Sequence, residues 1–115
     1  MNFIMRIVVT SIVAFGLSYI LSGVQIDGFT TAIVLAIVLA ILNAIVKPIL
    51  IFVTLPITVV TLGLFLFVIN ALIILLADKF IKGFNVDGFW WALLFSLLLS
   101  IVTSVLYKEK REEKE

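Results

Sequence analysis

Four long stretches without a charged residue divide the chain, and they constrain its fold more than any other feature. They are residues 7–26, 28–46, 48–77 and 88–107. A helix needs about 20 predominantly apolar residues to cross a bilayer. The chain is 64% hydrophobic and 13% charged, whereas soluble domains are about 45–50% apolar. The pattern predicts an all-α integral membrane protein whose four transmembrane helices cover about residues 4–22, 29–46, 57–77 and 89–107.

Two prolines lie in the third uncharged stretch, which is longer than one span needs. Proline lacks an N–H group and disfavours helix in the residue before it. Pro48 therefore predicts that the second helix ends near Lys47. Pro56 is expected in the first turn of the third helix, where no N–H group is needed. The segment Ile49–Leu55 is too short to cross a bilayer and is expected to lie at the membrane interface or to enter the membrane shallowly.

The cations are distributed unequally between the two ends of the predicted spans. With four spans, the N-terminus, the 47–56 link and the C-terminal tail share one side, and Lys79 and Lys82 lie on the other. The first side carries six cations, namely Arg6, Lys47, Lys108, Lys110, Arg111 and Lys114. Because cytoplasmic loops are enriched in Lys and Arg, both termini are expected in the cytoplasm. Residues 1–107 would form a single transmembrane domain, and 108–115 a charged cytoplasmic tail.

A turn motif occurs twice, 60 residues apart. Gly-x-x-[Ile/Val]-Asp-Gly-Phe covers residues 23–29 and again 83–89. Two spans return the chain to the side from which it started. The halves, about 1–47 and 57–107, are therefore expected to be tandem helical hairpins, forming a parallel internal repeat about an axis along the membrane normal.

The residues of each motif suit a turn between helices. Gly23 and Gly83 can adopt positive φ and are expected to end the preceding helices. Asp27 and Asp87 are expected to cap the helices that follow, because a carboxylate accepts hydrogen bonds from free N–H groups at a helix start. Alternatively, the two carboxylates form an acidic ring at a pore mouth, and the two roles are compatible.

Small residues recur every four positions on the second and fourth predicted helices. They form two stripes, Gly28, Ala32, Ala36, Ala40 and Ala44 on one helix and Gly88, Ala92, Ser96, Ser100 and Ser104 on the other. Small residues let helix backbones approach closely in lipid. The stripes indicate either packing within one four-helix unit or contact between subunits, and the serines suit a wet lining better than a dry contact.

Two amides, Asn43 and Asn70, fall within the predicted spans. An amide in lipid needs a hydrogen-bond partner, so each is expected to bond across helices. Contact with a pore or a ligand is the alternative. Gly63, Asn70 and Ala77 recur at intervals of seven, so Asn70 is expected on a small-residue contact between helices.

Several function classes are disfavoured by composition. The chain has no Cys and no His, which removes disulfides, thiol nucleophiles and imidazole acid–base chemistry. No ionisable residue is expected within a span, as proton relays and ion-coupled carriers would require. A net charge of +1 provides no field that would attract nucleic acid. We expect no enzyme activity, cofactor, metal or nucleic-acid partner, and we identify no small-molecule substrate.

Five segments together resemble a known family. They are residues 43–48 (Asn-Ala-Ile-Val-Lys-Pro), 55–58 (Leu-Pro-Ile-Thr), 61–65 (Thr-Leu-Gly-Leu-Phe), 69–71 (Ile-Asn-Ala) and the motif at 83–89. Their order and spacing are similar to those of the small four-helix bacterial proteins of the phage-holin-like family (superfamily IV, mycobacterial type). The resemblance covers about residues 3–107. It implies a multi-pass protein of the bacterial cytoplasmic membrane that self-associates as a homo-oligomer, and it supplies no catalytic residues.

Three functions agree with these features. The first is a holin-like protein that self-associates in the membrane and forms a non-selective pore or lesion. The second is a non-enzymatic envelope protein with a structural, stress-related or partner-binding role. The third is a passive transporter of small solutes or lipids. In each of them the lipid bilayer is the main partner.

Overall fold

The structure is a computed structural model that describes residues 3–114, with side chains up to Leu106. Along the chain it contains α1 (Phe3–Ile20), β1 (Val24–Ile26), α2 (Phe29–Val53), α3 (Leu55–Val60), α4 (Phe65–Phe80), β2 (Phe84–Val86) and α5 (Phe89–Lys114). The predicted helical architecture is confirmed, whereas the two strands were not expected. α5 runs on into the predicted tail, whose side chains lie outside the described residues.

Among the described residues, three helices are long and apolar enough to cross a membrane, namely α1, α2 and α5 over Phe89–Leu106. α4 has 16 residues, which rise about 24 Å at 1.5 Å per residue. The hydrocarbon core of a bilayer is about 30 Å thick. The expected third span at 57–77 is wrong as a single helix, because α3 and a turn at 61–64 precede α4.

The second helix does not end at Lys47. α2 continues through Pro48 to Val53, so residues 49–53 belong to the same helix and do not form a separate segment. Membrane helices tolerate an internal proline because neighbouring groups and water satisfy the backbone carbonyl that it frees. The helix ends at Thr54, whose hydroxyl donates to the Leu50 carbonyl oxygen at 2.7 Å. Pro56 lies in the first turn of α3, as predicted.

The two turn motifs meet in a short antiparallel ladder. Val24 lies opposite Val86, Gln25 opposite Asn85 and Ile26 opposite Phe84. Two further backbone bonds extend the ladder. The Asp27 N–H donates to the Gly83 carbonyl oxygen at 2.9 Å, and the Asp87 N–H donates to the Gly23 carbonyl oxygen at 2.8 Å. The ladder joins turns that are 60 residues apart in the sequence.

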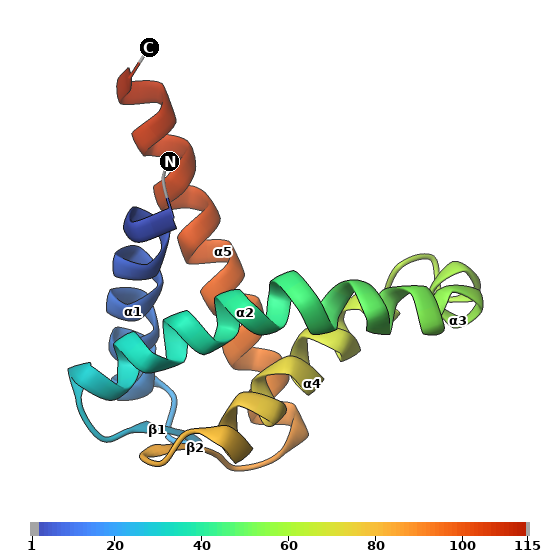
Figure 1. Ribbon diagram of the computed structural model, residues 1–115, viewed down its shortest axis with the longest axis horizontal. Helices are drawn as coiled ribbons and strands as arrows, with labels where there is room; N and C mark the ends of the chain where they lie inside the picture. Colours follow the sequence, from blue (N-terminus) through green and yellow to red (C-terminus); the bar gives the residue numbers. More distant parts are fainter. Residues whose placement is uncertain (1–2, 115) are drawn as a thin grey trace.

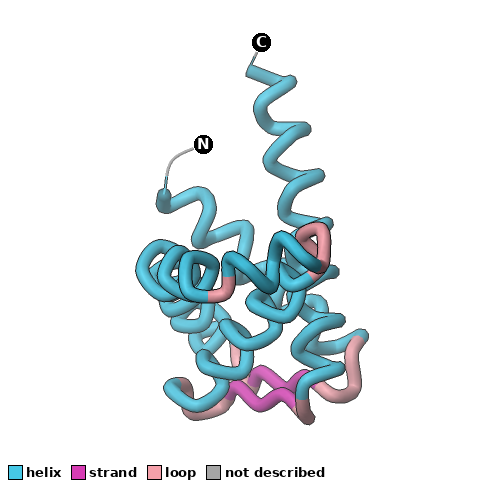
Figure 2. The backbone as a smooth tube through the Cα atoms, turned by 90° about the vertical axis from the view of Figure 1, so that its right-hand side faces the viewer, coloured by secondary structure: helices cyan, strands magenta, loops and turns pink. Residues whose placement is uncertain are grey.

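The helices diverge from this ladder as two arms (Figure 1). α1 packs against α2 and α5, and α4 packs against the same two helices. One arm ends with the start of α1 and the end of α5, and the other ends at α3. Both chain termini lie at the end of the molecule opposite the strands (Figures 1 and 2).

The hydrophobic core lies where the two arms meet. Leu35, Ile69, Phe84 and Phe95 are completely buried there. The rings of Phe84 and Phe95 pack with their centroids 6.0 Å apart. Many large aliphatic side chains on the outer helix faces are exposed, which suits contact with lipid chains rather than water.

Candidate functional site

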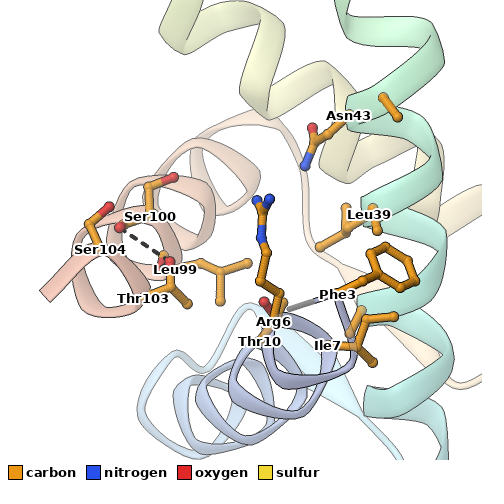
Figure 3. Close-up of a pocket in the computed structure, with 13 residues that line it drawn as sticks. Phe3, Arg6, Ile7, Thr10, Leu39, Asn43, Leu99, Ser100, Thr103 and Ser104 are labelled. Atoms are coloured by element: carbon orange, nitrogen blue, oxygen red, sulfur yellow. Dashed lines mark hydrogen bonds between the residues drawn. The ribbon is translucent and has the colours of Figure 1, made fainter. Parts of the chain in front are cut away.

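A cavity of about 600 Å³ lies between α1, α2 and α5 (Figure 3). Its polar lining consists of Arg6, Thr10, Asn43, Ser100, Thr103 and Ser104, and the remaining lining residues are Phe3, Ile7, Ala36, Leu39, Ala40, Ala44 and Leu99. α2 and α5 make no close backbone approach to each other within residues 3–114. The cavity therefore occupies the space between these two helices.

The small-residue stripes are divided by this cavity. Near the strands Ala32, Ala36, Ala92 and Ser96 are buried inside the chain. Farther along, Ala40 and Ala44 line the cavity from α2, and Ser100 and Ser104 line it from α5. Gly28 and Gly88 immediately precede their helices, with Gly88 at φ +114°. Within the described residues the two stripes therefore do not pack directly on each other.

Two hydroxyl groups of α5, those of Thr103 and Ser96, donate to their own helix. Thr103 Oγ1 donates to the Leu99 carbonyl oxygen at 2.6 Å and lies 3.3 Å from that of Ser100. Ser96 Oγ donates to the Leu93 carbonyl oxygen at 2.9 Å. A hydroxyl that donates in this way keeps lone pairs that can accept. The α5 wall is therefore polar without being charged.

Arg6 is the one charged side chain among the described residues that line the cavity. It belongs to α1, and its guanidinium group points into the cavity towards Asn43 (Figure 3). Arg6 also fell within the predicted span at 4–22, so this charge belongs to a helix long enough to cross a membrane. The uncharged stretch begins only after Arg6, but the helix begins at Phe3.

The two asparagines have different surroundings. Asn43 lines the cavity, and it also lines a second cavity of about 450 Å³ together with Lys47, Pro48, Ile51, Phe52 and Leu55. Asn70 is half-buried in α4 and lines neither cavity. Gly63 does not share a helix face with Asn70 and Ala77, because it lies in the turn before α4.

Gly23 does not have the predicted role, which was to end the first helix with a positive φ. α1 and α4 end at Ile20 and Phe80, before the glycines. Gly83 has the expected positive φ, at +90°, but Gly23 does not. A Cβ atom on Gly23 would overlap the indole ring of Trp91. Gly23 therefore allows the start of α5 to approach the first turn closely.

The capping role predicted for Asp27 is wrong. Gly28 is the N-cap of α2, and no side-chain cap bond is formed there. Asp27 Oδ1 instead accepts a hydrogen bond from the Thr31 hydroxyl at 2.6 Å. Asp87 is exposed, two positions before α5. The Asp27 carboxylate is thus bonded to a side chain in the first turn of α2.

Asp78 was not recognised from the sequence. This half-buried residue lies in α4, and its Oδ2 accepts a hydrogen bond from the Val86 N–H at 3.2 Å. The bond ties the end of α4 to β2. The sequence signal was its position as the first charge after the third uncharged stretch, but nothing local indicated its partner.

Comparison with known proteins gives consistent matches. The family described as "Mycobacterial 4 TMS phage holin, superfamily IV" matches residues 1–105. An uncharacterized protein of Streptomyces coelicolor is 45% identical over 80 residues, which are 66% of this chain and 64% of that protein. The chain thus spans just under two thirds of that relative. The uncharacterized membrane protein YvlD of Bacillus subtilis is 36% identical over 89 residues, covering 76% of this chain and 75% of YvlD. No solved structure matches the chain.

Proposed function

Because the chain belongs to the mycobacterial four-span phage holin superfamily IV, we propose that it self-associates in the bacterial cytoplasmic membrane and forms a non-selective passage there. The proposed function is holin-like and not enzymatic. Contact between copies would be made by the open part of the small-residue stripes, namely Ala40, Ala44, Ser100 and Ser104.

The cavity carries this proposal. A polar surface that faces lipid is costly, because lipid chains cannot form hydrogen bonds. Ser100, Ser104 and Ala44 are exposed in the isolated chain and line a cavity that contains Arg6. A second copy that covers this face would shield the polar groups from lipid. The serines would then line a passage that water can enter.

A second element of the proposal is that four segments cross the membrane as two parallel repeats. Residues at an offset of 60 are buried in both halves, as in the pairs Ala14/Ile74 and Leu35/Phe95. The hydrogen bonds from Asp27 to Gly83 and from Asp87 to Gly23 exchange under the same offset. Both observations support a twofold relation. α4 would cross a locally thinned bilayer, since short spans are accommodated in this way.

The proposed topology places both termini in the cytoplasm and both turn motifs outside. The cation excess near the termini supports this orientation, and both termini lie at the end opposite the strands. Topology reporters fused after Glu115 and within the turn at Phe84 are expected to report opposite sides of the membrane. Reports from the same side would contradict an even number of spans.

Ser100→Leu tests the proposed contact between copies. Ser100 is exposed at the cavity, so a leucine there has room within one chain but would hold a second copy away. We expect the detergent-solubilised protein to shift towards monomer with an unchanged melting temperature. Induced cells should also lose less membrane potential, measured with a potential-sensitive dye.

Ser22→Leu is the matched control for this substitution, because Ser22 is exposed near the strands and outside both cavities. The control should leave oligomer size and membrane potential unchanged. Equal oligomer size in the wild type and in both variants would refute contact through the cavity face. Dissociation by Ser22→Leu alone would refute it too.

A further inference from the structure

We propose that a third cavity, beside the strand ladder, binds a saccharide that carries an N-acetyl group. This turn cavity has a volume of about 410 Å³, within the range of small-molecule sites. Its polar lining consists of Ser18, Tyr19, Gln25, Asp27 and Asn85. The strands lie at the end of the molecule opposite both termini (Figures 1 and 2). The inference therefore goes beyond the proposed function, which rests on the cavity between α1, α2 and α5.

The repeated turn provides an internal reference for the turn cavity. Under the offset of 60 residues, Gly23 corresponds to Gly83, and Thr31 corresponds to Trp91. A Cβ atom on Gly23 would overlap the Trp91 ring, so the indole fills that corner. A Cβ atom on Gly83 would instead overlap the Asp27 carboxylate, and the smaller Thr31 replaces the tryptophan. The corner that is filled by an aromatic ring in one half is therefore polar and open in the other.

Two neighbours position the carboxylate of Asp27. The Thr31 hydroxyl donates to Oδ1 at 2.6 Å. Gly83, at φ +90° and without a Cβ atom, leaves room for the carboxylate to pack against it. Asp27 Oδ2 accepts no hydrogen bond from another described residue. Because a hydrogen bond to an ionised acceptor is stronger than one between neutral groups, this oxygen is well placed to accept from a ligand hydroxyl.

Two side-chain amides lie next to each other on the exposed face of the ladder. Gln25 lies directly opposite Asn85, and side chains in such a pair begin about 4.5–5.5 Å apart at Cβ. Both residues are exposed and line the turn cavity, and neither amide bonds to another described residue. A side-chain amide can both donate and accept. An N-acetyl group has one N–H and one C=O, so one amide would accept from the first and the other would donate to the second.

Tyr19 provides an aromatic wall near the end of α1. Its side chain is 78% exposed, and its ring is restrained by a T-shaped contact with Phe15, with centroids 5.2 Å apart. A tyrosine combines an apolar ring with a polar hydroxyl. A sugar ring has a matching construction, with an apolar C–H face and hydroxyl groups around its edge. The ring of Tyr19 would therefore stack on the sugar while the amides and Asp27 bond to its edge.

The charge of the lining favours an uncharged ligand. Asp27 is the one charged side chain among the described residues that line the turn cavity. Its carboxylate would repel a phosphate or a sulfate. An ammonium group would pair with Asp27, but it has no acceptor, so the N–H groups of Gln25 and Asn85 would gain nothing from it. Hydroxyl and N-acetyl groups both donate and accept, and they can use every polar group of the lining.

The test is a titration of the full chain with N-acetylglucosamine and with its linear trisaccharide, followed by saturation-transfer NMR in a detergent whose headgroup is not a sugar. We expect both sugars to bind. Asp27→Asn should weaken binding about tenfold or more, the size expected for one hydrogen bond to a charged group. The asparagine oxygen can still accept from Thr31. Asp87→Asn is the matched control, because Asp87 corresponds to Asp27 in the repeat but lies outside the turn cavity, and it should bind as the wild type does.

Gln25→Ala provides a second variant in case Asp27→Asn fails to fold, and it should weaken binding by a smaller factor. Glucosamine, with an ammonium group in place of the N-acetyl group, should bind more weakly than N-acetylglucosamine. The proposal would be overturned if neither sugar bound, if glucosamine bound more tightly, or if Asp27→Asn and Asp87→Asn had equal effects.

The two probes also distinguish the sources of the sugar. Tighter binding of the trisaccharide would support a glycan chain as the ligand, and equal affinities would support a single free sugar. Ser100→Leu should bind both sugars as the wild type does, because Ser100 lies outside the turn cavity. Sugar binding by a chain that never associates would refute the proposed function alone, and association without sugar binding would refute this inference alone.

Discussion

Phe84→Ala is expected to lower the free energy of unfolding by about 3–5 kcal/mol, the range for deleting a buried phenylalanine side chain. Phe84 is completely buried in β2, where its ring packs against Phe95. Removing the ring leaves a cavity at the point where the two arms meet, and the surrounding atoms lose dispersion contacts. The loss can be measured from denaturant unfolding in detergent micelles, followed by circular dichroism.

Phe80→Ala is the matched control, because Phe80 ends α4 with 68% of its surface exposed. That side chain contacts the surrounding medium rather than the core. Its removal should change the free energy of unfolding by much less than that of Phe84. If the two variants were equally destabilised, the strand pair would not be the centre of the packing described here.

Gly23→Ala is expected to destabilise the protein by about 1–3 kcal/mol, the usual effect of overpacking. The added Cβ atom would overlap the ring of Trp91. Trp91 would have to move, and with it the start of α5 that the ladder holds beside Gly23. The change can be measured as a fall in melting temperature and as altered tryptophan fluorescence.

Gly16→Ala is expected to have the opposite sign. Gly16 lies within α1, and a Cβ atom there would meet no atom within 4 Å. Alanine is favoured over glycine inside a helix by about 1 kcal/mol. If the melting temperature rises for Gly16→Ala and falls for Gly23→Ala, the destabilisation by Gly23→Ala is caused by the overlap with Trp91. Two falls of equal size would contradict that assignment.

The sequence predicted the elements that depend on local pattern. Uncharged stretches of sufficient length identified α1, α2 and α5, and the repeated motif identified the two turns. The error at Pro48 has a physical reason. Proline is a strong helix breaker in water, where the backbone has an alternative partner, but inside a membrane a helix is one of few ways to satisfy backbone groups. α2 therefore continues past Pro48.

The candidate site could be predicted only in part, because it depends on contacts between helices that are far apart in the sequence. The stripes drew attention to a face of small residues on α2 and a face of small and hydroxyl-bearing residues on α5. They gave no indication that these helices make no close approach to each other, or that the two turns are joined by a ladder between two three-residue strands. Such short strands have no periodicity to detect. Without the ladder, neither the cavity nor the position of Arg6 within it could be deduced.

Cysteine cross-linking at Ser100 tests the central claim, that copies meet across the open cavity face, most directly. The chain has no cysteine of its own, so single variants report on one position each. Oxidation of native membranes containing Ser100→Cys is expected to give a covalent dimer, because a disulfide requires Cα atoms about 4.4–6.8 Å apart. Leu94→Cys, on an exposed part of α5 outside both cavities, should stay monomeric. A dimer from Leu94→Cys and none from Ser100→Cys would contradict the claim.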